Sequence, residues 1–284
     1  MSAPAYSSSH PADGEATPAA GAGLRAAIRT AGFVGLALIA VLVGMSDVVA
    51  PYAADALHVG AALAPPSALH PFGTDLLGRD ILSETLHGLA ITVDYAVLAM
   101  LVTLLAGGFA GFVSARLPWG SGVILRWIGG ILGAVPALLL AILFIGITTR
   151  DLAPLAAGLA AAPLAFVRAY DRAGALARSR HAEYARATGI LSATLLRRDL
   201  VYEFRDTFLA NAARALAAVT ITLATVSFLG FGAVPPHRDL GLMIAAARAS
   251  YLEAWWTAAF PALALLLLIL FARLAAALEE GERP

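Results

Sequence analysis

Residues 91–114 read ITVDYAVLAMLVTLLAGGFAGFVS, an apolar run whose one carboxylate, Asp94, lies close to its start. A helix needs about 20 mostly apolar residues to cross the hydrocarbon core of a bilayer. Within lipid there is no water for the backbone to bond, so such a run forms a helix that satisfies its own N–H and C=O groups. The stretch therefore predicts a transmembrane helix.

Five further stretches have the same character. They lie at roughly 31–50, 127–147, 152–170, 209–231 and 254–274. The overall composition agrees, because 60% of the residues are hydrophobic and 13% are charged, whereas soluble domains carry about 25% charged residues. We therefore predict an all-α polytopic membrane protein with six transmembrane helices.

Prolines and small residues are expected to shape these spans. Pro136 and Pro261 lie inside the third and sixth spans, where the missing backbone hydrogen bond predicts a kink. The fourth span is rich in Ala and carries Pro154 and Pro163, so we expect it to pack closely inside the bundle. Two glycine patches at helical spacing are also predicted to be packing surfaces: Gly107, Gly108 and Gly111, and Gly129, Gly130 and Gly133.

The arginines predict the orientation, because cytoplasmic segments carry an excess of basic residues. All 19 basic residues of the chain are Arg. With the N-terminus inside, six spans place fifteen of these arginines on the cytoplasmic side and leave four outside. The four outer ones are Arg79, Arg150, Arg238 and Arg248. Both termini are therefore expected to be cytoplasmic.

This topology divides the chain into segments. Residues 1–28 are rich in Ser, Pro, Ala and Gly and have no apolar run, so we expect a flexible cytoplasmic tail. The transmembrane domain then covers 29–280, and 281–284 form a C-terminal tail. The main external segments are 51–90 and 232–253, and the largest cytoplasmic loop is 171–208.

Several kinds of chemistry are excluded by residues that the chain lacks. Without Cys there is no disulfide or thiolate site, and without Lys there is no phosphate-binding P-loop. The six His are scattered, which argues against a metal site. A formal net charge of zero argues against nucleic acid as a partner. We therefore expect no enzymatic activity and no catalytic, cofactor-binding or metal-binding residue.

The spans also lack the mid-depth ionisable groups that ion-driven transporters use as carriers. Asp47 and Asp94 lie near span ends, where interfacial or capping roles are expected. The chain is therefore expected to act with a partner. Two alternatives stay open, a self-contained secondary transporter or channel and a membrane scaffold that transports nothing.

The largest cytoplasmic loop contains a polar stretch, ARSRHAEYARATGILSATLLRRDLVYEFRD, at residues 177–206. Ala177–Thr188 has helix-forming residues and is followed by Gly189, which can close a helix in the left-handed conformation. A second short helix is expected to begin near Ser192, a candidate N-cap. The resulting bracket either docks a partner or is a solvated connector.

Three motifs resemble permease subunits of ABC importers. EYARATG at 183–189 is similar to the E-A-A-x-x-x-G signature of the loop that docks such permeases to their ATPases. HPFGTDLLGRDILSETLHG at 70–88 resembles the C-type permease of the dipeptide/oligopeptide/nickel importer family, and SFLGFGAVPP at 227–236 resembles the family's SFLGLG-x-x-PP stretch. The resemblance covers about residues 30–280, and it departs where Asp239-Leu240-Gly241 replaces the family's frequent SWG.

The resemblance implies a type I ABC importer permease fold and a role as half of the solute pathway. It implies a homologous B-type permease subunit, two ABC ATPase subunits that bind ATP and Mg, and an extracytoplasmic solute-binding protein as partners. The location would be the cell inner membrane. The solute would be a peptide, a nickel complex or a similar small molecule.

The resemblance also assigns residues of the coupling loop. Glu183, Tyr184 and Ala185 take the E-A-A positions, and Gly189 takes the glycine position. Three arginines of the loop are expected either to contact acidic groups of the ATPase or to anchor the loop inside. These are Arg186, Arg197 and Arg198.

On the outer side, Asp75, Arg79 and Asp80 are expected to belong to the outer gate or to a contact with the binding protein. The turn at Pro235-Pro236 is expected there too. Asp80 is predicted to cap an amphipathic helix that lies at the outer surface and leads into the second span. The apolar residues of that helix are Leu82, Leu86 and Leu89.

Overall fold

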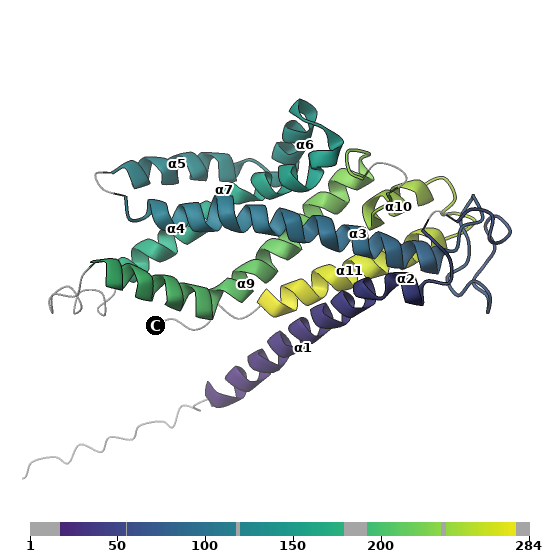
Figure 1. Cartoon of the computed structure of the whole chain (residues 1–284), viewed down its shortest axis with the longest axis horizontal. Helices are drawn as coiled ribbons and strands as arrows, with labels where there is room; N and C mark the ends of the chain where they lie inside the picture. The colour runs from purple at the N-terminus through teal and green to yellow at the C-terminus, as the bar shows by residue number, and fades with distance from the viewer. Residues whose placement is uncertain (1–17, 55, 118–119, 179–191, 234–236, 277–284) are drawn as a thin grey trace, which may run out of the picture.

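The computed structural model describes residues 18–54, 56–117, 120–178, 192–233 and 237–276, with the backbone alone for 18–22 and 192–208. Within these ranges there is no strand, and the one isolated bridge joins Thr74 to Asp80. In Figure 1 the bundle is elongated, α1 runs beside α11, and the loop between α2 and α3 lies at one end together with α10.

The elements follow one another as α1 (Pro18–Gly44), α2 (Ser46–Val49), α3 (Ile81–Val102), η1 (Thr103–Phe109), α4 (Ala110–Ser114), α5 (Ser121–Ala134), α6 (Ala137–Ile147), η2 (Arg150–Leu152), α7 (Ala153–Ala177), α9 (Ser192–Phe228), α10 (Leu240–Ala247) and α11 (Trp256–Ala276).

Among the described residues, five helical segments are long and apolar enough to cross a membrane. They are Gly23–Gly44, Ile81–Ser114, Arg150–Ala177, Leu209–Phe228 and Trp256–Ala276. A sixth span results if the bent pair α5 and α6 is counted as one. The all-α polytopic prediction is confirmed.

The kink predicted at Pro136 is confirmed, and it is large. The axes of α5 and α6 differ by 93°. Val135, which ends α5, has extended backbone, as expected of a residue whose helical conformation clashes with a following proline ring. Beyond the bend, α6 is buried against α7 and α9 through Leu140, Ala141 and Ile145.

The other predicted kink, at Pro261, does not interrupt the helix. α11 runs without a break from Trp256 to Ala276 and contains Pro261. Only five residues of the helix precede this proline, which is little more than one turn. The sixth span is therefore one helix, and the kink expected at Pro261 stays a prediction.

Two helices are longer than expected. α1 starts at Pro18, so residues 18–28, assigned to a flexible tail, are helical; their Ala-rich sequence favours a helix. α9 begins at Ser192, as predicted, but it continues to Phe228 as one helix of 37 residues. No Gly or Pro lies between these ends, so nothing in the sequence separates a short helix from the fifth span.

The second span contains a π-helical stretch that the sequence analysis did not anticipate. Such stretches are rare and often occur at functional sites. In η1, the Thr103 hydroxyl donates to the carbonyl of Ala99 at 2.9 Å and to that of Gly158 on α7 at 3.0 Å. Gly107 lies so close to the Ala162 carbonyl that a Cβ would collide with it. Close contact with α7 therefore accompanies the widened turn.

The close packing predicted for the fourth span is confirmed. α7 packs against α3, η1, α4, α5, α6 and α9. A Cβ at Gly158 would lie 2.6 Å from the Ala99 carbonyl oxygen, so only glycine permits this approach of α7 to α3. The small buried residues of α7 are Ala153, Ala156, Ala157, Gly158, Ala160 and Ala162.

The two glycine patches are confirmed in part. Gly107 and Gly111 face backbone carbonyls of α7, and Gly129 faces the Phe166 ring. Gly108 and Gly130 have open space where a side chain would lie. The packing surface is therefore narrower than the sequence pattern suggested.

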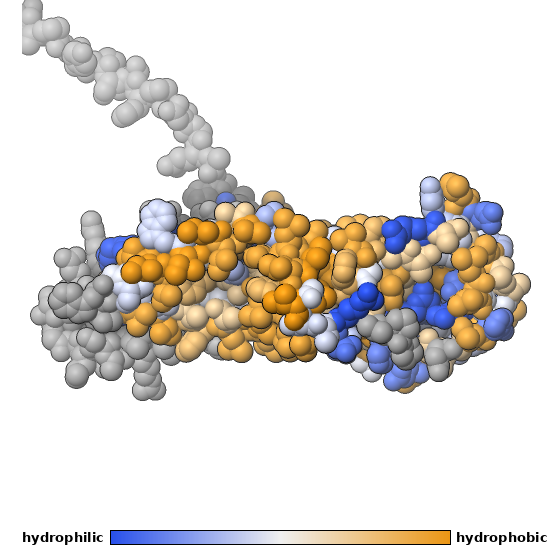
Figure 2. Space-filling model, turned by 90° about the horizontal axis from the view of Figure 1, so that it is seen from above, coloured by the Kyte–Doolittle hydropathy of each residue, from blue (hydrophilic) through white to orange (hydrophobic). Residues whose placement is uncertain are grey.

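Apolar side chains cover the middle of the molecule. Figure 2 shows a broad hydrophobic surface over the bundle, with hydrophilic residues gathered toward one end. Exposed apolar patches of this size need a nonaqueous partner, and the chain is a multi-pass membrane protein. The exposed large residues include Leu38, Leu105, Ile131, Leu139 and Leu266.

The two neighbouring glycines of η1 provide a matched test of this packing. Gly107→Leu should lower the free energy of unfolding by about 1–3 kcal/mol, because overpacking forces α7 away from η1. Gly108→Leu should leave it nearly unchanged, because no atom lies within 4 Å of a Cβ there. Thermal unfolding in detergent measures both. Equal destabilisation by the two variants would contradict the observed packing.

Candidate functional site

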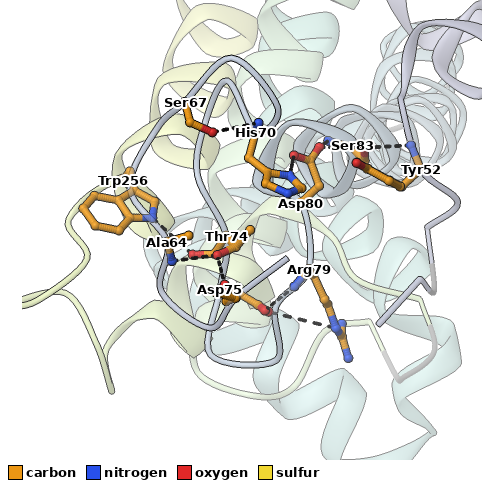
Figure 3. A network of polar contacts seen from close by, with 11 residues as sticks. Tyr52, Ala64, Ser67, His70, Thr74, Asp75, Arg79, Asp80, Ser83 and Trp256 are labelled. Carbon is orange, nitrogen blue, oxygen red and sulfur yellow. Dashed lines mark hydrogen bonds and ion pairs between the residues drawn. The ribbon is translucent and has the colours of Figure 1, made fainter. Parts of the chain in front are cut away.

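The hydrophilic end of the bundle is formed by residues 51–84 and 237–254, which we call the polar cap. Figure 3 shows part of its network of polar contacts. The described residues of 51–80 form turns without a helix, so this part of the cap is ordered by individual hydrogen bonds rather than by regular structure.

Thr74 is the centre of the first part of the cap. Its hydroxyl donates to the Ala61 carbonyl at 2.6 Å and accepts from the Ala64 amide at 2.8 Å. Its carbonyl accepts from the Trp256 indole at 3.1 Å. Thr74 is fully buried. These bonds attach the loop to the beginning of α11.

Asp80 joins the same loop to α3. One carboxylate oxygen accepts from the Ser83 amide at 2.9 Å and from its hydroxyl at 2.7 Å. The other lies 3.0 Å from Nδ1 of His70, which itself is buried and stacks on Tyr52. The predicted N-cap is confirmed, and the carboxylate also binds a histidine that the sequence did not connect to it.

The amphipathic surface helix expected after Asp80 is a wrong prediction. α3 continues directly into the second span, and it turns polar residues inward. Ser83, Glu84 and Thr85 are buried, whereas Leu82 and Leu86 are partly exposed. The reason is that the cap loop and the segment before α10 supply hydrogen-bonding partners for the first turn of α3.

Asp75 forms a tight turn before Asp80. Its carboxylate accepts from the amides of Leu77 at 2.8 Å and Arg79 at 2.9 Å. Gly78 within the turn has a φ of +66°, a left-handed conformation that favours glycine. The turn directs the Arg79 side chain toward Asp75 and α3 (Figure 3).

Glu84 binds the guanidinium groups of two arginines. Its carboxylate accepts from Arg79 Nη1 at 2.8 Å and from Arg238 Nη1 at 2.7 Å and 2.8 Å. Asp75 lies 3.8 Å from the same Arg238 nitrogen. Glu84 was not recognised from the sequence. Two features of the sequence could have indicated its role: it lies in the first turn of a helix, where acidic residues are favoured, and it follows Arg79 by five residues.

A second buried arrangement, which we call the buried node, lies around the start of α10. Asp239 caps α10 by accepting from the Leu242 amide at 2.8 Å, and it also accepts from the Ser227 hydroxyl. The Leu240 amide donates to the Thr92 hydroxyl at 3.1 Å. The node therefore joins α9, α10 and α3. Gly241 allows the α9 backbone to approach, because a Cβ there would lie 2.5 Å from the Ala224 carbonyl oxygen.

The predicted coupling-loop residues cannot be placed in the same way. Five of them lie outside the described residues: Glu183, Tyr184, Ala185, Arg186 and Gly189. The same holds for Pro235 and Pro236, which were predicted to belong to the outer gate. The backbone at Arg197 and Arg198 belongs to α9, and their side chains are not described. The assignment of these residues stays a prediction.

Beside Glu84 there is a small pocket lined by Ala54, Glu84, His87, Gly88, Ile91, His237 and Arg238. Nδ1 of His87 lies 2.7 Å from the Ser83 carbonyl, and Nε2 lies 3.3 Å from Asp47. Among the described residues no group of three or more His, Cys, Asp or Glu could hold a metal ion. The polar side chains around this pocket are thus bonded mainly to other groups of the polar cap and of the neighbouring helix ends.

The role of Asp80 can be measured against another aspartate. Asp80→Ala should lower the free energy of unfolding by about 1–3 kcal/mol, because it removes the cap of α3 and leaves buried donors unpaired. Asp47→Ala should cost less than about 0.5 kcal/mol, because the Asp47 side chain is 92% exposed. Thermal unfolding in detergent distinguishes them. If Asp47→Ala lowered the free energy of unfolding as much as Asp80→Ala, the structural role assigned to Asp80 would be contradicted.

Comparison with known proteins identifies the family. No protein-family model matches the chain. The glutathione transport system permease protein GsiD of Pectobacterium atrosepticum is 31% identical over 208 residues, which cover 72% of this chain and 69% of that protein.

Two further relatives extend the match. The di/tripeptide transport system permease protein DppC of Pseudomonas aeruginosa is 29% identical, over 78% of this chain and 76% of its own length. The oligopeptide transport system permease protein OppC of Mycobacterium bovis is 28% identical, over 79% and 78%. The chain therefore belongs to the permease subunits of dipeptide, oligopeptide and glutathione transport systems, and it is a transmembrane permease of an ABC importer.

Proposed function

We propose that this chain is the C-type half of a permease pair that imports peptides across the cell inner membrane. A homologous B-type subunit forms the other half of the path. Two ABC ATPase subunits bind ATP and Mg and hydrolyse the nucleotide, and an extracytoplasmic binding protein delivers the peptide. The names of the three relatives, which transport dipeptides, oligopeptides or glutathione, support a peptide as the solute. This chain has no catalytic role in the proposal.

The proposed orientation places the polar cap outside and residues 171–208 inside. The support is the distribution of arginine, because four of the 19 lie in the segments assigned to the outside and cytoplasmic segments are enriched in Lys and Arg. The cap is then the surface available to the binding protein, and the coupling loop is the surface available to the ATPases.

The observation that carries the proposal is the continuity of α9. Its 37 residues exceed the roughly 20 that cross a hydrocarbon core, and Figure 1 shows that α9 bends between its first part and the part that crosses the bundle. α9 therefore extends beyond the membrane as one unbroken helix, from Ser192 in the expected coupling loop to Phe228 beside the buried node. A displacement of the coupling loop by the ATPases is transmitted to the polar cap through one continuous element.

This mechanism predicts that bending α9 uncouples transport from ATP hydrolysis. Ala218 is exposed on the membrane-embedded part of α9. Ala218→Pro removes one backbone hydrogen bond and bends the helix, yet helices in membranes tolerate proline. In the reconstituted complex, ATP hydrolysis should persist while peptide uptake falls by an order of magnitude or more.

Ala218→Leu is the matched control and should transport normally, because it changes the same exposed surface without bending the helix. Co-purification of the ATPases with both variants shows that the complex is assembled. Full peptide uptake by the assembled Ala218→Pro complex would contradict the role of α9. ATP-independent uptake by this chain alone, driven by an ion gradient, would contradict the proposed function as a whole.

A further inference from the structure

The ion-pair cluster of the polar cap is built from two unequal parts. Asp75, Arg79 and Glu84 belong to one short stretch of chain, which we call the socket. Arg238 comes from the segment between α9 and α10, 154 residues beyond Glu84. Its guanidinium contacts Glu84 at 2.7 Å and Asp75 at 3.8 Å. The cluster thus consists of one side chain inserted among three that are already together.

The socket is organised without Arg238. Asp75 is held by the Leu77 and Arg79 amides, and Glu84 is held by the first turn of α3 and by Arg79. Two carboxylates and one guanidinium leave the socket with a formal charge of −1, which Arg238 neutralises. All contacts of Arg238 with Glu84 and Asp75 run through one nitrogen, Nη1. The socket is therefore a preformed site for a single cationic nitrogen.

When Arg238 leaves the socket, Asp75 has a second hydrogen-bond donor close by, the Nε of Arg79. Nε of Arg79 is buried and has no hydrogen-bond partner within the described chain. It lies 4.0 Å from an Asp75 carboxylate oxygen. A small shift of Asp75 toward this nitrogen would replace the contact that Asp75 makes with Arg238. After Arg238 departs, the Asp75 carboxylate can therefore accept a hydrogen bond from Arg79 instead.

α10 is attached more firmly to α9 than to α3. On the α9 side, the buried Asp239 carboxylate binds the Ser227 hydroxyl, and Gly241 lies against the Ala224 carbonyl. Removing a partner from a buried carboxylate is costly. On the α3 side, the neutral bond between Leu240 and Thr92 is supplemented by the Arg238 ion pair and by a buried apolar cluster that contains Leu89 and Met243.

The Arg238 ion pair differs from the buried node in its access to water. The side chains of Arg238 and Arg79 are 19% and 18% exposed, and Asp239 is 4% exposed. The Glu84 side chain is 7% exposed, but it keeps its bond to Arg79 when Arg238 leaves. Separating a pair costs less where one charge can be rehydrated and the other keeps a second partner than where a buried charge is left alone. The contact between α3 and α10 is therefore the one that can open while α10 stays on α9.

We propose that Arg238 is a detachable latch, which holds α10 against α3 when its guanidinium occupies the socket and releases the polar cap when it leaves. The proposal rests on the proposed function, because it is movement of α9 that would pull Arg238 out. It adds a named positioning residue and the chemistry of the site that receives it, a guanidinium between Glu84 and Asp75.

The opening can be measured directly, because the chain has no native cysteine. Met243 on α10 is 3% exposed, and its sulfur lies 2.8 Å from the place of a Cβ on Gly88 of α3. In the assembled complex without ATP, Met243→Cys should react slowly with a membrane-impermeant maleimide. Adding Arg238→Ala should raise the labelling rate several-fold, whereas Arg238→Lys should raise it less.

A double-mutant cycle tests the socket itself. Glu84→Gln should raise the labelling rate of Met243→Cys as Arg238→Ala does, because the main carboxylate that holds Arg238 is then neutral. Adding Glu84→Gln to Arg238→Ala should raise the rate little further, because the contact between the two side chains is already absent.

Arg248→Ala is the matched control, since Arg248 is another exposed arginine at the end of α10 and its guanidinium lies over the Phe228 ring rather than in the socket. Its labelling rate should equal that of the parent. An Arg238→Ala rate equal to the parent rate, or effects of Glu84→Gln and Arg238→Ala that multiply in the double variant, would overturn the latch. Labelling needs no ATP, so this failure is distinct from failure of peptide uptake, which would overturn the proposed function instead.

Discussion

A backbone that crosses a bilayer must satisfy its own hydrogen bonds, and polar side chains must therefore find partners where the helices end. In this chain the helix ends of the polar cap meet that constraint with two buried carboxylates. Asp80 caps α3 and binds His70 of the preceding loop. Asp239 caps α10 and binds Ser227 of α9. Each carboxylate thus completes one helix and attaches it to a second element, which makes the polar cap a set of joined helix ends.

These contacts do not attach all the helices of the polar cap to one another in the same way. α9 and α10 share a buried charged contact, so they are expected to move together. α10 and α3 share a neutral hydrogen bond and the partly exposed ion pair of Arg238. Since α9 extends from the expected coupling loop to this junction, the weaker contact lies where a displacement of α9 would arrive. The architecture therefore combines one continuous helix across the membrane with one reversible contact at its far end.

Features governed by local sequence could be predicted, and features governed by distant packing could not. The apolar spans, the bend at Pro136 and the cap at Asp80 each follow from neighbouring residues. The 93° size of the bend depends on where α6 packs, and the π-helix at Thr103 depends on Gly158 of another helix.

The surface helix after Asp80 was predicted wrongly because the partners of its polar face, such as Arg238, lie far along the chain. The extent of the 1–28 tail was wrong as well, since α1 begins at Pro18. The kink at Pro261 stays a prediction. The roles of Glu183 and Gly189 stay predictions, because these residues lie outside the described chain.

The central claim, that α9 connects a coupling loop on one side of the membrane with the polar cap on the other, is tested most directly by two single cysteines. Ser192→Cys marks the start of α9, and Ala54→Cys marks an exposed position of the polar cap. In sealed right-side-out vesicles, a membrane-impermeant maleimide should label the cysteine at 54 at once and the cysteine at 192 only after permeabilisation. Labelling of both in sealed vesicles, or of the cysteine at 192 alone, would contradict the account.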